Sequence, residues 1–343
     1  MYLLLAALLA APIHYATDPN FCFDVPSGHA VNGAKIQLYR CNGKPSQDFD
    51  TGTDASVASS LAPPAVPAPA PAAPAASHLV DPGTPAKDGY TVFFSDEFDG
   101  TDLDLTKWNL VTDGSGGGNQ EEEYYLPFSA NRSMSNSVLT IHALKQSFLG
   151  QPWTSAKLTT LGVADATYGY IEAKIKVPQG QGAWPAFWLM PKDSLWGVWP
   201  SSGEIDIMEI LGGAPNSQHM TLHYGKNWPQ QEQIGGTVTA TPGTDYSQDF
   251  HTYAVDWQPD HMDFYVDGVN VYTVKSTDAQ WQTDVQGAPV STCSGGWPFC
   301  KPFYLILNLA VGGAWPGPPD PTINAFDLKI DFVRWYQVAG QKD

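Results

Sequence analysis

Residues 202–210 read S-G-E-I-D-I-M-E-I and interleave three acids with apolar side chains. Side chains at even offsets along a β-strand share a face, so Glu204 and Asp206 point the same way. Glu209 follows Glu204 at an odd offset and would face the opposite side of a regular strand. A β-bulge at the Ile207-Met208 step absorbs one residue and returns Glu209 to the face of the other two acids. The stretch therefore predicts a bulged strand with three carboxyl groups on one side.

The spacing of the two glutamates suits chemistry that needs a pair of carboxyl groups. At roughly 3.3 Å per residue, their Cα atoms would lie about 13 Å apart. Glutamate side chains that lean inward bring a carboxyl separation of about 5–5.5 Å, typical of retaining glycosidases, within reach. The alternative is a solvated strand face, but three like charges on one face weaken strand pairing. Such a cluster usually persists because chemistry uses it, so we expect a catalytic cluster.

The charge of the chain argues against two classes of partner. Its 343 residues carry 17 basic and 35 acidic side chains, which gives a net charge of −18. Nucleic acids and anionic membranes both favour a basic surface, so we expect neither as a partner. The chain is rich in aromatic residues, which can stack on sugar rings or fill an all-β core.

Composition divides the chain into four segments. Residues 1–16 contain a short apolar run that resembles a secretory signal, which predicts a secreted, extracellular protein. Residues 18–50 form a small module bounded by cysteines, and residues 51–88 are a Pro/Ala-rich linker with the composition of an extended spacer. Residues 89–338 are densely strand-like and long enough for one large domain.

The four cysteines predict disulfide bonds rather than a metal site. Cys22 lies near Cys41 in the sequence, and Cys293 lies near Cys300. Three connectivities are formally open, and the short separations favour the two local pairs. Two disulfides fit a secreted chain.

The large segment reads as a succession of short strands. Residues 170–177 alternate apolar and charged side chains, and residues 303–311 are almost continuously apolar, as in a central strand. Residues 262–274 predict a hairpin around Asp267-Gly268. In residues 328–333, Leu328, Ile330 and Phe332 alternate with the other three residues. Helical periodicity is hard to find, so we expect an all-β sandwich.

Several motifs of this segment, in order, resemble glycoside hydrolase family 16 and its laminarinase-like endo-β-1,3-glucanases. They read S-D-E-F-D-G (95–100), G-N-Q-E (118–121), Y-G-Y-I-E-A-K (168–174), G-A-W-P-A-F-W-L-M-P (182–191), T-L-H-Y-G (221–225), N-L-A-V-G-G (308–313) and I-D-F-V-R (330–334), with the acid cluster between the fourth and fifth. The resemblance implies a concanavalin-like β-jelly-roll sandwich with a substrate cleft across its concave sheet.

The resemblance also assigns roles within the acid cluster. Glu204 matches the nucleophile and Glu209 the general acid/base, with Asp206 between them as a residue that tunes both. A retaining mechanism needs one ionised carboxylate and one protonated carboxyl group. Mutual repulsion disfavours ionisation of all three, so at least one should keep its proton to higher pH.

Further positions follow from the same resemblance. It implies substrate-binding roles for Trp184, Trp188, His223, Asn119, Glu121, Trp199 and Trp315, with a core position as the alternative for Trp188 and a structural role as the alternative for His223. Asp331, together with a backbone carbonyl near Glu97, resembles a structural calcium site. Catalysis by two carboxyl groups needs no cofactor.

The N-terminal module resembles one repeat of a ricin-type lectin. The resemblance implies hydrogen-bonding roles for Asp24 and Gln47 and a stacking role for Tyr39. The usual Q-x-W motif reads Q-D-F here, at residues 47–49, and a trefoil needs three repeats where this chain has one. We expect a small β-trefoil-like fragment, either a degenerate remnant or a working sugar-binding module.

These observations favour a secreted, monomeric, retaining endo-β-1,3-glucanase that acts on laminarin-like chains. The alternatives within enzymes are a β-1,3-1,4-glucanase and a transglycosylase, which share the same chemistry. A non-catalytic β-glucan-binding protein is the alternative from another class. The three intact acids argue against it.

Overall fold

The computed structural model describes residues 79–225, 231–278 and 297–338 in full, and five short strands nearer the N-terminus by their backbone. The chain divides into two units, residues 1–73 and 74–343. In the first unit, β2 (His14–Tyr15), β3 (Asp18–Asp24) and β4 (Gln37–Arg40) form one sheet, and β1 (Ala11–Pro12) pairs with β5 (Asp48–Phe49). The side chains of Asp24, Tyr39 and Gln47 lie outside the described residues, so the lectin-like fragment stays a prediction.

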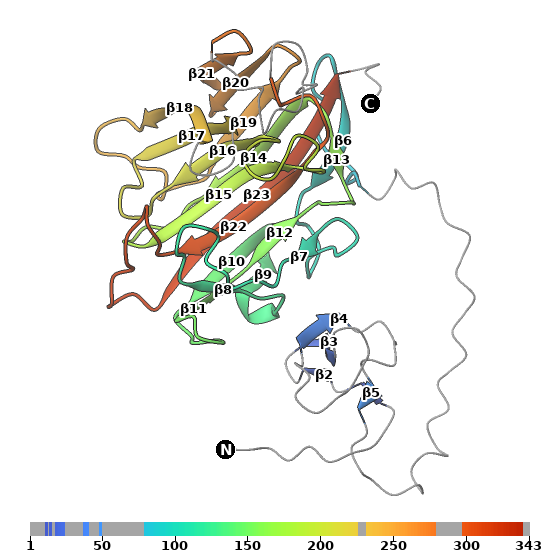
Figure 1. Cartoon of the computed structure of the whole chain (residues 1–343), viewed down its shortest axis with the longest axis vertical. Coiled ribbons are helices and arrows are strands. Elements are labelled where there is room, and N and C mark those ends of the chain that lie inside the picture. Colours follow the sequence, from blue (N-terminus) through green and yellow to red (C-terminus); the bar gives the residue numbers. More distant parts are fainter. Residues whose placement is uncertain are drawn as a thin grey trace, which may run out of the picture. The chain divides into compact units, whose positions relative to one another are not determined.

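The second unit is a sandwich of two sheets, as the sequence predicts (Figure 1). One sheet has the order β21 (Val269–Lys275), β20 (His261–Val266), β19 (His251–Trp257), β14 (Gly169–Lys176), β23 (Ala325–Val338), β10 (Val138–Leu144), β11 (Trp153–Ser155) and β8 (Glu123–Tyr125), with β6 (Tyr90–Asp96) on β23 and β9 (Arg132–Ser135) on β10. The other has the order β18 (Gln231–Thr239), β17 (Ser217–Gly225), β16 (Glu204–Ile210), β15 (Ala183–Pro191), β22 (Phe303–Val311), β12 (Lys157–Thr159) and β7 (Asn109–Leu110), with β13 (Asp165–Ala166) on β22.

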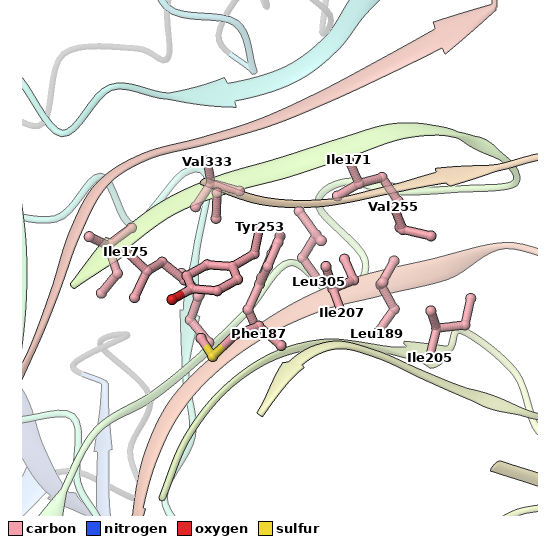
Figure 2. Close-up of a cluster of buried hydrophobic side chains, with 14 of the residues drawn as sticks. Ile171, Ile175, Phe187, Leu189, Ile205, Ile207, Tyr253, Val255, Leu305 and Val333 are labelled. Atoms are coloured by element: carbon pink, nitrogen blue, oxygen red, sulfur yellow. The ribbon is translucent and has the colours of Figure 1, made fainter. Parts of the chain in front are cut away.

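A hydrophobic core fills the space between the two sheets. Figure 2 shows Ile171, Tyr253 and Val333 of the first sheet directed towards Phe187, Ile207 and Leu305 of the second. All six side chains are at most 1% exposed. Because the core takes one face of the second sheet, the other face of that sheet is left for a binding site.

The strand predictions for β14, β22 and the hairpin are confirmed. Strand β22 is buried along nearly its whole length and lies between β15 and β12. Asp267 and Gly268 join β20 to β21 with φ angles of 51° and 76°, as a type I′ turn requires.

The predicted alternation at residues 328–333 is wrong beyond Ile330. In the pairing of β14 with β23, Lys174 lies opposite Phe332 and Ile175 opposite Ile330, so Asp331 is an extra residue. This bulge reverses the faces that follow it. Val333 is therefore buried, and Phe332 is half-buried under the guanidinium of Arg334.

Two further features bear on the predicted setting of the protein. Within the part of the chain that the structure describes, no helix is long and apolar enough to span a bilayer. Cys300 is the one cysteine in the fully described ranges, and it is not a free thiol. Its expected partner Cys293 lies outside those ranges, so both disulfide pairings stay predictions.

Candidate active site

The three acids of β16 share one face because the strand carries the predicted bulge. On one side, Asp206 pairs with Trp188 and Met208 with Phe187, which leaves Ile207 without a partner. The pairing with β17 shifts at the same place. Ile207 and Met208 both enter the core, at 1% and 0% exposure, as does Ile205 (Figure 2). The acids therefore lie on the face of the sheet that is turned away from the core.

Glu204 is held from two directions. The indole nitrogen of Trp199 donates a hydrogen bond of 2.6 Å to its Oε2. Nε2 of His223, on the neighbouring strand β17, lies 3.9 Å from its Oε1. Trp199 is 38% exposed, so this ring forms part of the rim of the site.

Asp206 is the most deeply buried member of the cluster. It is 3% exposed, and its Oδ2 lies 3.1 Å from Nε2 of His223. His223 therefore lies beside the acids, as the resemblance implies, and its substrate-binding role stays a prediction.

Glu209 lies at the opposite end of the acid row and accepts a hydrogen bond there. The indole nitrogen of Trp184 donates a hydrogen bond of 3.0 Å to its Oε1. The ring of Trp184 meets that of Trp315 edge to face at 5.3 Å, and Trp315 lies 5.1 Å from the ring of His219. Trp184 and the exposed Trp315 thus flank Glu209 as Trp199 flanks Glu204.

Burial and mutual repulsion both shift the acids towards the protonated form. Burial raises the pKa of Glu204 to about 8, with a contribution from the charge of Asp206, while His223 and the Trp199 N–H group act in the opposite direction. Burial likewise raises the pKa of Asp206 to about 8. The pKa of Glu209 is raised well above its ordinary value by burial and then by the charges of Asp206 and Glu204. The site therefore holds protons that an exposed cluster would lose near neutral pH.

Trp188 belongs to the site and not to the core. Its indole nitrogen donates to Oδ1 of Asn308 at 2.7 Å, and Nδ2 of Asn308 donates to the Tyr125 hydroxyl at 3.0 Å. The Tyr125 hydroxyl in turn donates to Oε2 of Glu121 at 3.4 Å. Trp188 and Glu121, both predicted from the sequence, are thus joined through two residues that sequence reasoning did not identify.

Lys157 is another residue that sequence reasoning missed. Its ammonium group lies 4.7 Å from the centre of the Trp188 ring and 5.7 Å from that of Tyr125. Burial lowers its pKa, and the charges of Glu121 and Glu204 act against that shift. The one signal for Asn308 was a polar residue inside an apolar strand, whereas the local sequence around Lys157 gave none.

Asn119 lies at the edge of the site. Its backbone carbonyl accepts a hydrogen bond of 2.7 Å from the amide of Ala314, next to Trp315. Its exposed side chain bonds only weakly to the carbonyl of Gly117, at 3.5 Å. The contact brings the predicted residues Asn119 and Trp315 to one loop cluster.

Cationic side chains pair with both acids at the predicted structural calcium site. Asp331 forms an ion pair of 2.7 Å with Lys174. Both carboxylate oxygens of Glu97 accept hydrogen bonds from Arg334, at 2.8 and 2.7 Å. Calcium is bound by oxygen ligands, which include backbone carbonyls. These side-chain pairs do not test the carbonyl near Glu97, so the calcium site stays a prediction.

Comparisons with known proteins agree with this geometry. The family described as Glycosyl hydrolases family 16 matches residues 120–316. Glucan endo-1,3-beta-glucosidase A1 of Niallia circulans is 38% identical over 275 residues, which are 75% of this chain but 39% of that protein. The Beta-glucanase of Rhodothermus marinus is 36% identical over 72% of this chain and 85% of its own length. The X-ray structure of the laminarinase from Rhodothermus marinus is 37% identical and superposes with a TM-score of 0.64 over 72% of this chain and 97% of that one.

Proposed function

The chain belongs to glycosyl hydrolases family 16, and we propose that it hydrolyses β-1,3-glucan with Glu204 and Glu209 as its two reacting groups. The observation that carries this proposal is the bulge of β16, which puts both glutamates on one face of the sheet between exposed tryptophans. A non-catalytic glucan-binding protein would have no need of three buried, mutually repelling acids.

The proposed reaction is a double displacement with retention of configuration. The Glu204 carboxylate attacks the anomeric carbon while the Glu209 carboxyl group gives its proton to the departing glycosidic oxygen. Glu209, now ionised, then removes a proton from water, which attacks the same carbon and releases Glu204. His223 and the Trp199 N–H group partly offset the burial that raises the pKa of Glu204 to about 8. Burial and the charges of Asp206 and Glu204 raise the pKa of Glu209 well above its ordinary value, which supports Glu209 as the proton donor.

Asp206 acts on the reaction through its neighbours. Its charge raises the pKa values of Glu204 and Glu209, and it lies against His223. When Glu204 becomes an ester in the intermediate, that acid loses its charge, and the pKa of Glu209 should fall as a general base requires. Asp206 thus serves as a positioning and tuning residue.

The aromatic side chains at the two ends of the acid row support a polysaccharide substrate. Trp199 stands beside the nucleophile, and Trp315 stands beside Trp184 at the proton donor. Apolar ring faces of this kind suit sugar rings, and two such sites on either side of the reacting groups suit internal cleavage of a chain. We therefore propose endo action, with mixed-linkage β-1,3-1,4-glucan as the second candidate substrate.

We further propose that the protein is secreted and acts as a monomer. The apolar run at residues 2–11, followed by small residues, supports export. Both cysteine pairings also fit an oxidising compartment.

The experiment that tests the proposal is release of reducing sugar from laminarin and from mixed-linkage β-glucan by wild type and Glu204→Gln. Wild type should release sugar from laminarin faster than from mixed-linkage glucan. Glu204→Gln should release sugar at a rate lower than that of wild type by at least about 1,000-fold. Glu232→Gln is the matched control, because Glu232 pairs with Tyr224 on the core-side face of β17 and β18. Activity of Glu204→Gln equal to wild type would refute the assignment, and a folded wild type inactive on both glucans would refute the function.

A further inference from the structure

Three potential metal ligands converge beside the nucleophile. One donor atom each of Glu204, Asp206 and His223 lies within 4.8 Å of the other two. Nε2 of His223 is 3.1 Å from Oδ2 of Asp206 and 3.9 Å from Oε1 of Glu204. Zinc binds such ligands at about 2.0–2.2 Å, which places the ligand atoms of a tetrahedral site roughly 3.3–3.6 Å apart. The two separations from Nε2 of His223 lie just below and just above that range, and the carboxylate oxygens of Glu204 and Asp206 lie within 4.8 Å of each other.

A separate observation indicates an unfilled coordination need at the same point. Asp206 is 3% exposed, and its Oδ2 is buried with no hydrogen-bond partner among the described residues. The atom faces Nε2 of His223 at 3.1 Å. A buried carboxylate oxygen without a donor is costly, and a cation would satisfy it.

An ion can reach Glu204, the third potential ligand, from the cleft. The side chains of Glu204 and His223 are 15% and 18% exposed, so an ion can enter from the cleft. Trp199 occupies Oε2 of Glu204, so a ligand bond would use Oε1, and the ion would replace the hydrogen bond that Glu204 shares with Asp206. By contrast, the pairs His142–Asp327 and His251–Asp267 do not belong to a group of three ligands within the fully described ranges.

We propose that the cleft binds one Zn²⁺ ion through Oε1 of Glu204, Oδ2 of Asp206 and Nε2 of His223. Imidazole together with carboxylates suits zinc, whereas magnesium and calcium favour oxygen ligands alone. Three protein ligands leave the fourth position to water. His223 thus gives the site its selectivity among divalent cations.

The ion and the glucan exclude each other. The ion holds the carboxylate that must attack the sugar, so it acts as a reversible inhibitor that competes with substrate. This consequence rests on the proposed function, but the binding itself does not. Nδ1 of His223 has no hydrogen-bond partner within the described ranges, and such outer partners are worth about 10–100-fold in metal affinity. We therefore expect micromolar rather than nanomolar binding.

The test is calorimetric titration of the full chain with zinc chloride in a buffer free of chelators. Wild type should bind one more zinc ion than His223→Gln does, or should bind zinc at that site at least about 10-fold more tightly than the variant does. His142→Gln is the matched control, because His142 also contacts an aspartate, Asp327, at 2.7 Å. Titration with magnesium chloride should give no heat at this site.

A second variant protects the test against misfolding. Asp206→Asn should lose the same zinc site, and both variants are checked by circular dichroism. Equal zinc binding by wild type and His223→Gln, or absence of binding at millimolar zinc, overturns the inference. Zinc binding by a protein inactive on laminarin would refute the proposed function alone, and hydrolysis without zinc binding would refute the metal site alone.

Discussion

The indole nitrogen of Trp199 lies 2.6 Å from Oε2 of Glu204 and donates a hydrogen bond to it. At the other end of the acid row, Trp184 gives Glu209 the same kind of bond at 3.0 Å. Each bond favours the ionised form of its acid and so lowers the pKa of that acid. Two tryptophans therefore act separately on the two halves of the reaction.

Replacement of Trp199 by Phe keeps the ring and removes the donor. The pKa of Glu204 should rise, so the acidic limb of the kcat/KM profile should move to higher pH by about 0.5–1 unit. The measurement is the pH dependence of laminarin hydrolysis. A shift of the alkaline limb alone would contradict the assignment of Glu204 as nucleophile.

Replacement of Trp184 by Phe should move the opposite limb. Loss of its N–H group raises the pKa of Glu209, so the proton donor stays protonated to higher pH and the alkaline limb moves upward by about 0.5–1 unit. The Trp199→Phe profile, measured under the same conditions, is the control. If both variants moved the same limb, the two glutamates would not have separate roles.

Asp206→Asn should shift the whole profile towards acid. The Asp206 charge raises the pKa of both glutamates, so its removal lowers both and moves both limbs to lower pH. The activity at the new optimum should also fall, because Asn changes the contact that the Asp206 carboxylate makes with Nε2 of His223 at 3.1 Å. An unchanged profile would show that Asp206 is neutral throughout the working range.

Glu209→Gln should separate the two chemical steps. Hydrolysis of laminarin should fall by about 100- to 10,000-fold, since proton donation to the leaving oxygen is lost. An aryl laminaribioside with an acidic phenol needs little proton donation, so it should give a burst of phenol and then slow turnover. Glu204→Gln should give no burst, and a burst there would reverse the two roles.

The acid cluster and its bulge could be predicted from the sequence because the expected reaction places a requirement on the faces of β16. Three carboxyl groups had to share one face, and one extra residue was the simple means. No such requirement marked Asp331, so its bulge and the burial of Val333 were missed. Lys157 and Asn308 were missed for another reason. Their place in the site depends on how β12, β15 and β22 align, which local patterns do not encode.

Gly169 allows a test of the fold away from the acids. Its φ is 118°, and an added Cβ would lie 2.2 Å from the carbonyl oxygen of Tyr336 on β23. Gly169→Ala should therefore lower the free energy of unfolding by about 3 kcal/mol or more.

Gly162→Ala is the control for the change at Gly169. Gly162 also has a positive φ, of 72°, but an added Cβ meets no atom within 4 Å. It should cost about 1–2 kcal/mol from backbone strain alone. The measurement is urea unfolding followed by tryptophan fluorescence, and equal losses for the two variants would contradict the clash.

The bulge of β16 makes the catalytic pair tolerant of a change in length. Without Ile207, residues 204–210 would read E-I-D-M-E-I, and all three acids would still fall on alternate positions of a regular strand. A descendant gene could therefore lose that codon and keep both reacting groups turned towards the glucan. The distance between the two glutamates along the strand would change little, because Ile207 already has no partner on β15 and adds no full step to the strand. The bulge thus lets evolution insert or delete one residue between nucleophile and proton donor without inverting either.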